Sequence, residues 1–351
     1  MQPEKLYGGN KKGVRTIFPV PCRTMPLKTG RENSSDPFFE QCAAGRRRFL
    51  AQLTSLAAVS ALGPAAAAPA AEAKQAAAPL PTVQLGTYRI TRLVAGSNPI
   101  NGYSYLGPHV DRHMKEYFTP ERAADFLLDC QRAGITAHQY SRTPRNAESL
   151  RLAREKGSTL HFLGLHSSRK ELQEFVRNTK PIAVAHHGGV TDTLFSQGKS
   201  QEVHDYVKAV HDLGLLAGVS AHNPDCIKQI ADEGWENDYF MTCFYFLTRH
   251  QVSAAKGKEV TEPLLEVSHP FYREDPLAMT AVVRQLDKPC FGFKILGAGR
   301  LCASQNMVGE AFHFAFTHIK PIDGVIVGMF PRFFDEITAN AEYARQWGKI
   351  S

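Results

Sequence analysis

The sequence predicts a single-domain (β/α)8 barrel, the TIM-barrel fold, over residues 79–351. Short β-branched or small-residue runs alternate with amphipathic stretches, this alternation occurs eight times, and it fills roughly 260 residues, the usual size of such a barrel. The predicted strands are 92–96, 136–140, 160–166, 182–187, 216–222, 239–244, 290–296 and 324–328. The predicted helices are 119–133, 147–156, 170–178, 200–213, 224–233, 276–286, 307–318 and 332–347. A doubly wound open sheet is the alternative that the same alternation permits.

Local signals define where several helices begin and end. Thr119 and Asn223 are each followed by a proline, which places a capping side chain directly before a proline at the first helical position. Glycines suited to a left-handed residue follow four of the helices, at Gly134, Gly157, Gly214 and Gly234. Segment 85–90 precedes the first barrel strand and is expected to form a short strand or hairpin that plugs the bottom of the barrel.

The net charge of +7 is concentrated in the first part of the chain. Residues 1–78 contain 11 Lys and Arg against 5 Asp and Glu, whereas residues 79–351 contain 30 against 29. A nucleic-acid-binding domain needs a basic surface on its folded part, so nucleic acid is not expected as a partner. No apolar run reaches the roughly 20 residues of a membrane-spanning helix, so no stable span is expected in the mature protein.

The leader resembles a twin-arginine (Tat) export signal. Arg46, Arg47 and Arg48 precede Phe49 and Leu50, giving the form R-R-x-F-L. An apolar run and an Ala/Pro tract with candidate cleavage sites follow in the expected order. We therefore expect residues 46–78 to be a Tat signal and linker, the Tat machinery to be a partner, and the mature protein to be periplasmic or otherwise extracytoplasmic. Residues 1–45 are expected to be a disordered N-terminal region or to precede the true start of translation. The alternative to a Tat signal is a disordered basic tail in which the arginine pair occurs by chance.

Four histidines end successive predicted strands, at His138, His166, His187 and His222. The carboxyl ends of barrel strands form the rim where barrel enzymes carry out their chemistry, and strand alternation places all four rings inward. Imidazole acts as a general acid or base and as a metal ligand. The sequence therefore predicts catalysis by His187 and His222, or a divalent-metal site formed by all four. Asp192 is the nearest carboxylate and is expected either to orient an imidazole or to cap a turn.

Lys294 lies midway along the seventh predicted strand, where alternation places Gly292 and Lys294 inward and Phe291 and Phe293 outward. A buried lysine needs a partner or a function, because burying a charge is costly. It would form a Schiff base, hold a substrate oxygen, or pair with a carboxylate. Lys294 is therefore the third predicted catalytic residue.

Glycine-bearing loops follow the seventh and eighth predicted strands, where barrels commonly bind phosphate. The first contains Gly297, Gly299 and Arg300, and the second contains Gly328 and Arg332. These residues are expected to bind a phosphate, with tight turns as the alternative. Two further rim loops, 96–118 and 245–275, are long enough for lids or binding walls, and their polar and aromatic residues suit a sugar or a similar polyol.

Two segments resemble the aldo-keto reductases. Segment 85–99 (LGTYRITRLVAGSNP) is similar to their opening hairpin and first strand. Segment 325–340 (VIVGMFPRFFDEITAN) is similar to the last strand and helix, which in that family hold NADP. Gly328 and Asn340 match that pattern, while Arg332 matches it more loosely. The resemblance implies cofactor binding by these residues and places His187 where the family keeps its catalytic histidine.

The rest of the reductase tetrad is absent. His138-Gln139 stands where the family has its aspartate, Leu165-His166 stands where it has its lysine, and Tyr140 comes too early to be its tyrosine. This pattern favours a barrel whose chemistry has been replaced, so a divalent metal is preferred to NADP as a cofactor.

Three functions agree with these features. The first is an exported enzyme that acts on a small polar, carbohydrate-derived substrate by histidine-mediated or metal-assisted lyase, isomerase or hydrolase chemistry. The second is a divergent NADP-dependent oxidoreductase. The third is a non-catalytic periplasmic ligand-binding barrel whose histidines line a pocket.

Overall fold

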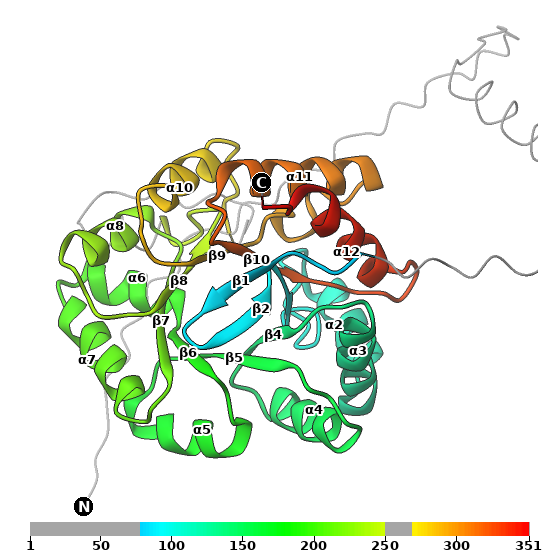
Figure 1. Cartoon of the computed structure of the whole chain (residues 1–351), viewed down its shortest axis with the longest axis horizontal. Helices are drawn as coiled ribbons and strands as arrows, with labels where there is room; N and C mark the ends of the chain where they lie inside the picture. The colour runs from blue at the N-terminus through cyan, green and yellow to red at the C-terminus, as the bar shows by residue number, and fades with distance from the viewer. Residues whose placement is uncertain (1–77, 250–268, 351) are drawn as a thin grey trace, which may run out of the picture. The chain divides into compact units, whose positions relative to one another are not determined.

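The computed structural model describes residues 78–249 and 269–350 and confirms the predicted (β/α)8 barrel (Figure 1). Eight parallel strands close on themselves, because the last strand pairs with both its predecessor and the first. They are β3 (Leu93–Gly96), β4 (Ala137–Ser141), β5 (His161–His166), β6 (Ala183–His186), β7 (Leu216–Ala221), β8 (Tyr239–Cys243), β9 (Cys290–Phe293) and β10 (Gly324–Gly328). The open-sheet alternative is therefore wrong. The predicted N-region (1–45) and nearly all of the predicted Tat signal (46–78) lie outside the described residues.

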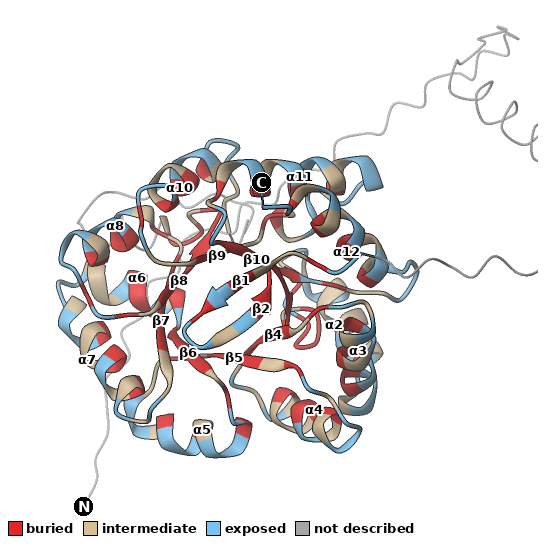
Figure 2. Ribbon diagram, viewed as in Figure 1, coloured by how far each residue is buried: buried red, intermediate tan, exposed pale blue. Residues whose placement is uncertain are grey.

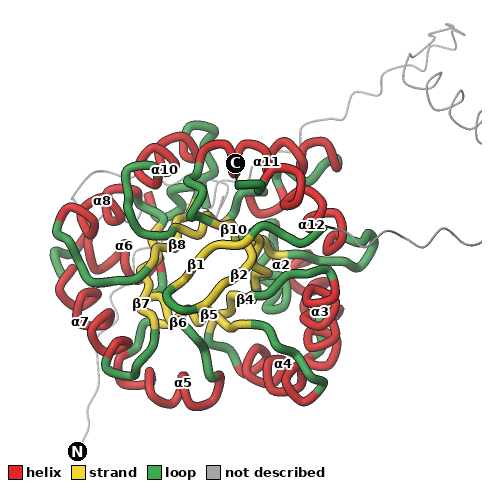
Figure 3. Tube along the Cα trace, in the orientation of Figure 1, coloured by secondary structure: helices red, strands yellow, loops and turns green. Residues whose placement is uncertain are grey.

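Helices surround the ring of strands (Figure 3). The crossover helices are α3 (Pro120–Arg132), α4 (Pro144–Glu155), α5 (Leu172–Thr179), α7 (Ser200–His211), α8 (Pro224–Asp232), α10 (Asp275–Val283), α11 (Gln305–His318) and α12 (Glu336–Trp347). Two more helices, α2 (Pro108–Tyr117) and α6 (Gly188–Ser196), lie in rim loops where the sequence predicted none, and 3-10 turns occur at η1 (Arg169–Glu171) and η2 (Gly297–Gly299). In the described part of the chain, every helix is too short or too polar to span a bilayer.

The bottom of the barrel is closed by a hairpin, as predicted. Strands β1 (Thr82–Leu85) and β2 (Tyr88–Thr91) pair antiparallel through a turn at Gly86, which has φ +56°. Leu85 and Ile90 are fully buried and pack against inward side chains of the barrel strands. The hairpin crosses the ring of strands in Figure 1. Because this end is plugged, the opposite end, where the strands terminate, is the mouth available for a ligand.

The core has two layers, one inside the barrel and one between the strands and the helices (Figure 2). Ala183 and Ala185 of β6 belong to the interior, whereas Val184 packs against the helices, as predicted. On β9 the predicted alternation is wrong. Phe291 lies in the interior, and Gly292 faces outward, where an added Cβ would lie 2.6 Å from the ring of Phe244. The outer layer can hold that phenyl ring only because position 292 has no side chain.

Arg92 connects three backbone segments at the bottom of the barrel. Its guanidinium donates to the carbonyl oxygens of Asp323 (2.7 Å), Lys320 (2.9 Å) and Gly348 (2.9 Å). The side chain is buried, and desolvation lowers its pKa to about 10, so it remains charged at neutral pH.

Replacing Arg92 with methionine is expected to lower the free energy of unfolding by about 3 kcal/mol, because buried carbonyls lose a charged donor. Urea unfolding followed by circular dichroism measures the effect. Arg89→Met is the control, since Arg89 is exposed on β2. Equal losses in the two variants would contradict the role assigned to Arg92.

Candidate functional site

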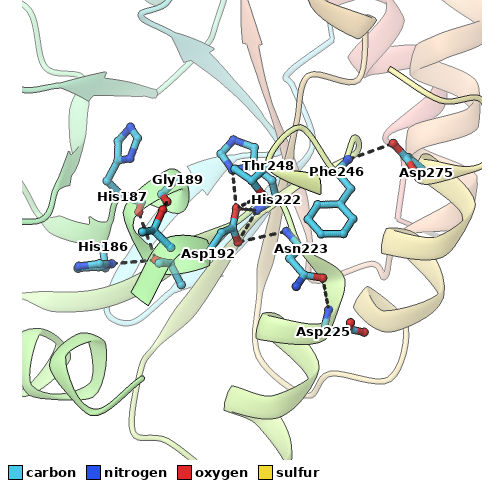
Figure 4. A network of polar contacts seen from close by, with 12 residues as sticks. His186, His187, Gly189, Asp192, His222, Asn223, Asp225, Phe246, Thr248 and Asp275 are labelled. Atoms are coloured by element: carbon cyan, nitrogen blue, oxygen red, sulfur yellow. Dashed lines mark hydrogen bonds and ion pairs between the residues drawn. The ribbon is translucent and has the colours of Figure 1, made fainter. Parts of the chain in front are cut away.

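His187 and His222 face the mouth from the ends of two neighbouring strands. His187 directly follows β6 and His222 directly follows β7, and each continues the inward-facing set of its strand. Their rings point to the same side of the ribbon in Figure 4, whereas the ring of His186 points in a different direction. The structure thus brings together the two histidines predicted as catalytic.

Asp192 holds His222 in place. The carboxylate lies on α6 with no solvent exposure of its side chain. It accepts hydrogen bonds from Nδ1–H of His222 (2.9 Å), from the backbone N–H groups of His222 and Asn223, and from the Thr248 hydroxyl (2.8 Å) (Figure 4). Because a carboxylate only accepts, Nδ1 carries the hydrogen and Nε2 is left as a proton acceptor. Of the two roles expected for Asp192, orienting an imidazole is the one that this geometry fits.

Gly188, the residue after His187, leaves room for the ring of His222. A Cβ at this position would lie 2.9 Å from Oγ of Ser220 and 3.2 Å from Cε1 of His222. A Cβ at the next residue, Gly189, would meet only atoms of the His187 ring, at an ordinary 3.6 Å. The packing around the His222 ring therefore requires glycine at 188 and tolerates alanine at 189.

We expect Gly188→Ala to reduce turnover by about 10-fold, because the added Cβ makes the Ser220 hydroxyl move and the His222 ring give by a fraction of the roughly 1 Å displacement that costs about 100-fold. Gly189→Ala is the matched control and should retain near-normal turnover. Steady-state kinetics on both variants tests this expectation, and equal rates would show that the position of His222 does not limit the reaction.

Lys294 reaches the mouth, although not by the predicted route. Strand β9 ends at Phe293, and Lys294 adopts a left-handed conformation with φ +60°, so strand alternation no longer sets its direction. Its Nζ lies 3.9 Å from the ring centroid of Tyr105 and 5.6 Å from that of Phe293. The ring of His222 packs edge-on against Phe293, with centroids 5.7 Å apart. Lys294 and His222 therefore both contact Phe293.

The electrostatics of the mouth are dominated by groups that carry or can carry positive charge. Burial lowers the pKa of His187, and the neighbouring His222 and Lys294 lower it further, while Asp192 partly opposes them. The side chain of His187 is exposed to water at the mouth, but protein atoms surround it closely enough to lower its pKa. Burial also lowers the pKa of His269, again with contributions from Lys294 and His222. Added positive charge is thus disfavoured at the mouth, whereas a negative group would be stabilised there.

His138 and His166 do not join this group, and their predicted inward direction is wrong. His138 shares the outer face of β4 with Tyr140, and its Nδ1 lies 2.9 Å from the carbonyl oxygen of Ala95. His166 stacks on Phe175 of α5, with ring centroids 4.7 Å apart. Both histidines face outward because Ala137 on β4 and Leu163 on β5 occupy interior positions, and strand alternation then places His138 and His166 on the opposite face.

The four predicted metal ligands are therefore divided between the mouth and the outer layer. Across residues 78–249 and 269–350, no group of three or more His, Cys, Asp or Glu is placed to hold a metal ion. His187 and His222 alone supply two imidazoles, fewer than the three protein ligands of a typical catalytic zinc site. The described residues do not fit the predicted four-histidine metal centre.

The outward histidines have a consequence for stability at low pH. Burial lowers the pKa of His138 from 6.5 to about 4 and that of His186 to about 3; the charges of His187 and His166 add to the effect on His186. Below pH 6.5 the unfolded chain takes up protons at these positions, whereas the folded chain does not until about pH 4 and pH 3. The stabilisation that comes from keeping these histidines neutral in the fold is thus fully present above pH 6.5, and it is lost as the pH falls below that value.

Between pH 7 and pH 4, His138 is expected to account for a loss of unfolding free energy on the order of 3 kcal/mol. Urea unfolding at several pH values measures this loss, and His138→Gln should reduce it by that amount. His109→Gln, which changes an exposed histidine, should leave the pH dependence unaltered. An unchanged pH slope in His138→Gln would contradict the assignment.

The residues predicted to bind phosphate do not form an open cradle. The guanidinium of Arg300 donates to the carbonyl oxygens of Gly297 (3.2 Å) and Tyr105 (3.0 Å) and stacks on Phe271. Gly299 packs against Leu106. These contacts tie together the loops after β3 and β9, so the tight-turn alternative describes the Gly297–Gly299 segment better.

The segment that resembles the NADP-binding end of aldo-keto reductases is only partly accessible. Pro99 lies 2.7 Å from where a Cβ on Gly328 would be, although Gly328 itself is exposed. Arg332 lies over the ring of Phe333, and Asn340 is buried in α12. Asn340 is therefore enclosed by the protein and does not fit the cofactor-binding role that the resemblance implies, whereas Gly328 and Arg332 are exposed.

Sequence reasoning missed two polar groups beneath the mouth. Nε2 of Gln139 and Oγ of Ser220 are buried, and neither has a hydrogen-bond partner among the described residues. Both lie on inward positions of their strands, and Ser220 lies directly below Gly188. Strand alternation placed Ser220 inward, but only the packed structure shows that its hydroxyl lacks a partner. A bound water or a substrate oxygen would satisfy such groups.

No family model matches the chain, and no curated protein is significantly similar to it. Similar solved structures include a truncated 3-deoxy-D-arabino-heptulosonate 7-phosphate synthase from Thermotoga maritima (11% identity, 76% of this chain and 91% of the other, TM-score 0.45). They also include an aldo-keto reductase from Bacillus halodurans (10% identity, 76% of this chain and 90% of the other, TM-score 0.45). A third is dihydropteroate synthase from Thermus thermophilus (11% identity, 76% of this chain and 98% of the other, TM-score 0.45). Likenesses this distant say nothing of the chemistry of this chain, and its own strand pairing establishes the barrel.

Proposed function

We propose that this protein is an enzyme that transfers a proton to or from a small polar, carbohydrate-derived substrate, in a lyase, isomerase or hydrolase reaction. The observation that carries the proposal is the buried Asp192 carboxylate, which accepts Nδ1–H of His222 at the mouth of the barrel. A buried carboxylate holding an imidazole in one tautomer is an arrangement suited to general acid–base catalysis.

In the proposed reaction, Nε2 of His222 accepts the proton and the carboxylate of Asp192 stabilises the resulting imidazolium. His187 has a lowered pKa and is largely neutral at pH 7, so it can donate a hydrogen bond to a substrate oxygen without adding charge. Lys294 supplies the positive charge of the mouth. The unpartnered Ser220 hydroxyl offers a further contact from below.

The test is a turnover screen of aldoses, sugar acids and their lactones, with the wild-type protein and the His222→Asn variant run in parallel. Turnover that the variant loses supports the proposal. Ligand binding without turnover in the wild type would indicate the non-catalytic binding barrel instead. Turnover that requires added NADP would indicate the divergent oxidoreductase.

We also propose that the protein is exported by the Tat machinery to the periplasm or another extracytoplasmic space. The support is the arginine pair Arg46-Arg47 followed by the apolar run and the Ala/Pro tract. Fusion of residues 1–78 to a reporter that folds in the cytoplasm tests this. Export that is lost when both arginines are changed to lysine supports the proposal, and export that survives the change contradicts it.

A further inference from the structure

The ammonium group of Lys294 lies at the mouth with aromatic rings for neighbours. Its Nζ is 3.9 Å from the centroid of Tyr105. Within residues 78–249 and 269–350, no carboxylate lies within 4.0 Å of this nitrogen. The nearby carboxylate, Asp192, uses its oxygens on His222, Asn223 and Thr248. A lysine placed against aromatic rings and left without a carboxylate is suited to bind an anion that comes from outside the protein.

A second imidazole flanks the same aromatic ring. His269 packs edge-on against Tyr105, with ring centroids 5.0 Å apart, so Lys294 and His269 are both neighbours of Tyr105. Nδ1 of His269 is buried and has no hydrogen-bond partner among the described residues. The site therefore offers one ammonium group and one unpartnered ring nitrogen around the same tyrosine ring.

The backbone at this contact is strained. Tyr105 and Lys294 are two of only four non-glycine residues with positive φ in the described ranges, at +58° and +60°. A non-glycine residue in this region is energetically unfavourable and persists only where its surroundings impose it. The two residues come from different loops, and Nζ of Lys294 lies against the ring of Tyr105, so the surrounding packing holds both in this conformation.

The charged donors that are still free at this site favour a carboxylate over a phosphate. Phosphate is commonly bound by a guanidinium fork, but the fork of Arg300 is already used on the carbonyl oxygens of Gly297 and Tyr105. Arg300 adds positive charge beside Tyr105, but its donors are used on protein carbonyls, so Lys294 remains as the charged donor there without a protein acceptor, and one such donor matches a carboxylate.

We propose that the substrate carries a carboxylate, which binds between Nζ of Lys294 and the imidazole of His269, so that a neighbouring part of the same molecule meets His222. This inference rests on the proposed active site and narrows its substrate class from polar carbohydrate derivatives to sugar acids. The shared contact of Lys294 and His222 with Phe293 keeps the two groups within reach of one small molecule.

The experiment compares matched ligands by isothermal titration calorimetry. The pairs are D-galacturonate with D-galactose, D-gluconate with D-sorbitol, and glycolate with ethylene glycol, with D-galactose 6-phosphate as the phosphate probe. We expect at least one carboxylate to bind about 10- to 100-fold more tightly than its neutral partner, the range of a charge-assisted hydrogen bond. Lys294→Met should abolish the preference, whereas Lys208→Met, which changes an exposed lysine of α7, should keep it.

Three outcomes would overturn the inference: no carboxylate is preferred over its neutral partner, the preference survives in Lys294→Met, or the phosphate probe binds most tightly. Repeating the titrations in His222→Asn separates this inference from the proposed catalytic function. If neither the wild type nor His222→Asn turns over any substrate, but the carboxylate preference persists in His222→Asn, the carboxylate site is supported and the proposed catalytic function is refuted.

Discussion

Replacing His222 with asparagine is expected to lower kcat by about 10²- to 10⁴-fold, the usual contribution of a general acid or base. Asparagine can still donate to the Asp192 carboxylate, so the hydrogen bonds around this carboxylate should survive, but its side chain cannot take up a proton at neutral pH. The thermal unfolding midpoint should therefore change little. Steady-state kinetics and a thermal melt on the same preparations measure the two quantities.

The matched control for this prediction is a second histidine–carboxylate pair on the outer surface. Nε2 of His211 lies 2.8 Å from Oδ2 of Asp238, away from the mouth at the end of α7. His211→Asn should leave kcat unchanged. If His211→Asn and His222→Asn reduce kcat equally, the loss is a general effect of removing a histidine–carboxylate pair, and the active site has been misplaced.

The barrel could be predicted from sequence because each of its strands and crossover helices carries a local signal. Strand alternation gave the directions of His187 and His222 correctly. On β6, for example, the small side chains of Ala183 and Ala185 suit the crowded interior, and His187 continues the same face. The same reasoning failed on β9, where the space for the ring of Phe244 decides which way Gly292 faces. That contact joins residues almost fifty positions apart, and no local pattern contains it.

The site was harder to predict than the fold because its contacts are distant in sequence. Asp192 and Thr248 meet across 56 residues, and the contact depends on α6, a helix absent from the predicted elements. Lys294 was expected at the mouth through strand alternation but reaches it through a left-handed backbone conformation. His138 and His166 are also histidines, but His138 lies near the start of β4 rather than at its predicted end, and both His138 and His166, which does end β5, lie in the outer layer. Residue type and spacing thus identified the mouth, whereas packing selected which side chains reach it.

Replacing Asp192 with alanine is expected to lower the free energy of unfolding by about 3–5 kcal/mol, the cost of removing one partner from a buried charged network. The backbone N–H groups of His222 and Asn223 and the hydroxyl of Thr248 would lose their acceptor while remaining enclosed. Urea unfolding followed by circular dichroism measures the loss. Thr248→Val removes one of the donors and should cost only about 1 kcal/mol, because the carboxylate keeps its other three.

Asp192→Asn separates the stabilising role of this residue from its role in catalysis. The amide has the same shape and keeps one acceptor oxygen, so its unfolding free energy should lie between those of the wild type and Asp192→Ala. Turnover should nevertheless fall by about 10⁴-fold, because an amide nitrogen facing Nδ1 favours the wrong tautomer of His222. If Asp192→Asn loses stability but keeps full turnover, the carboxylate only supports the fold, and His222 does not depend on it for proton transfer.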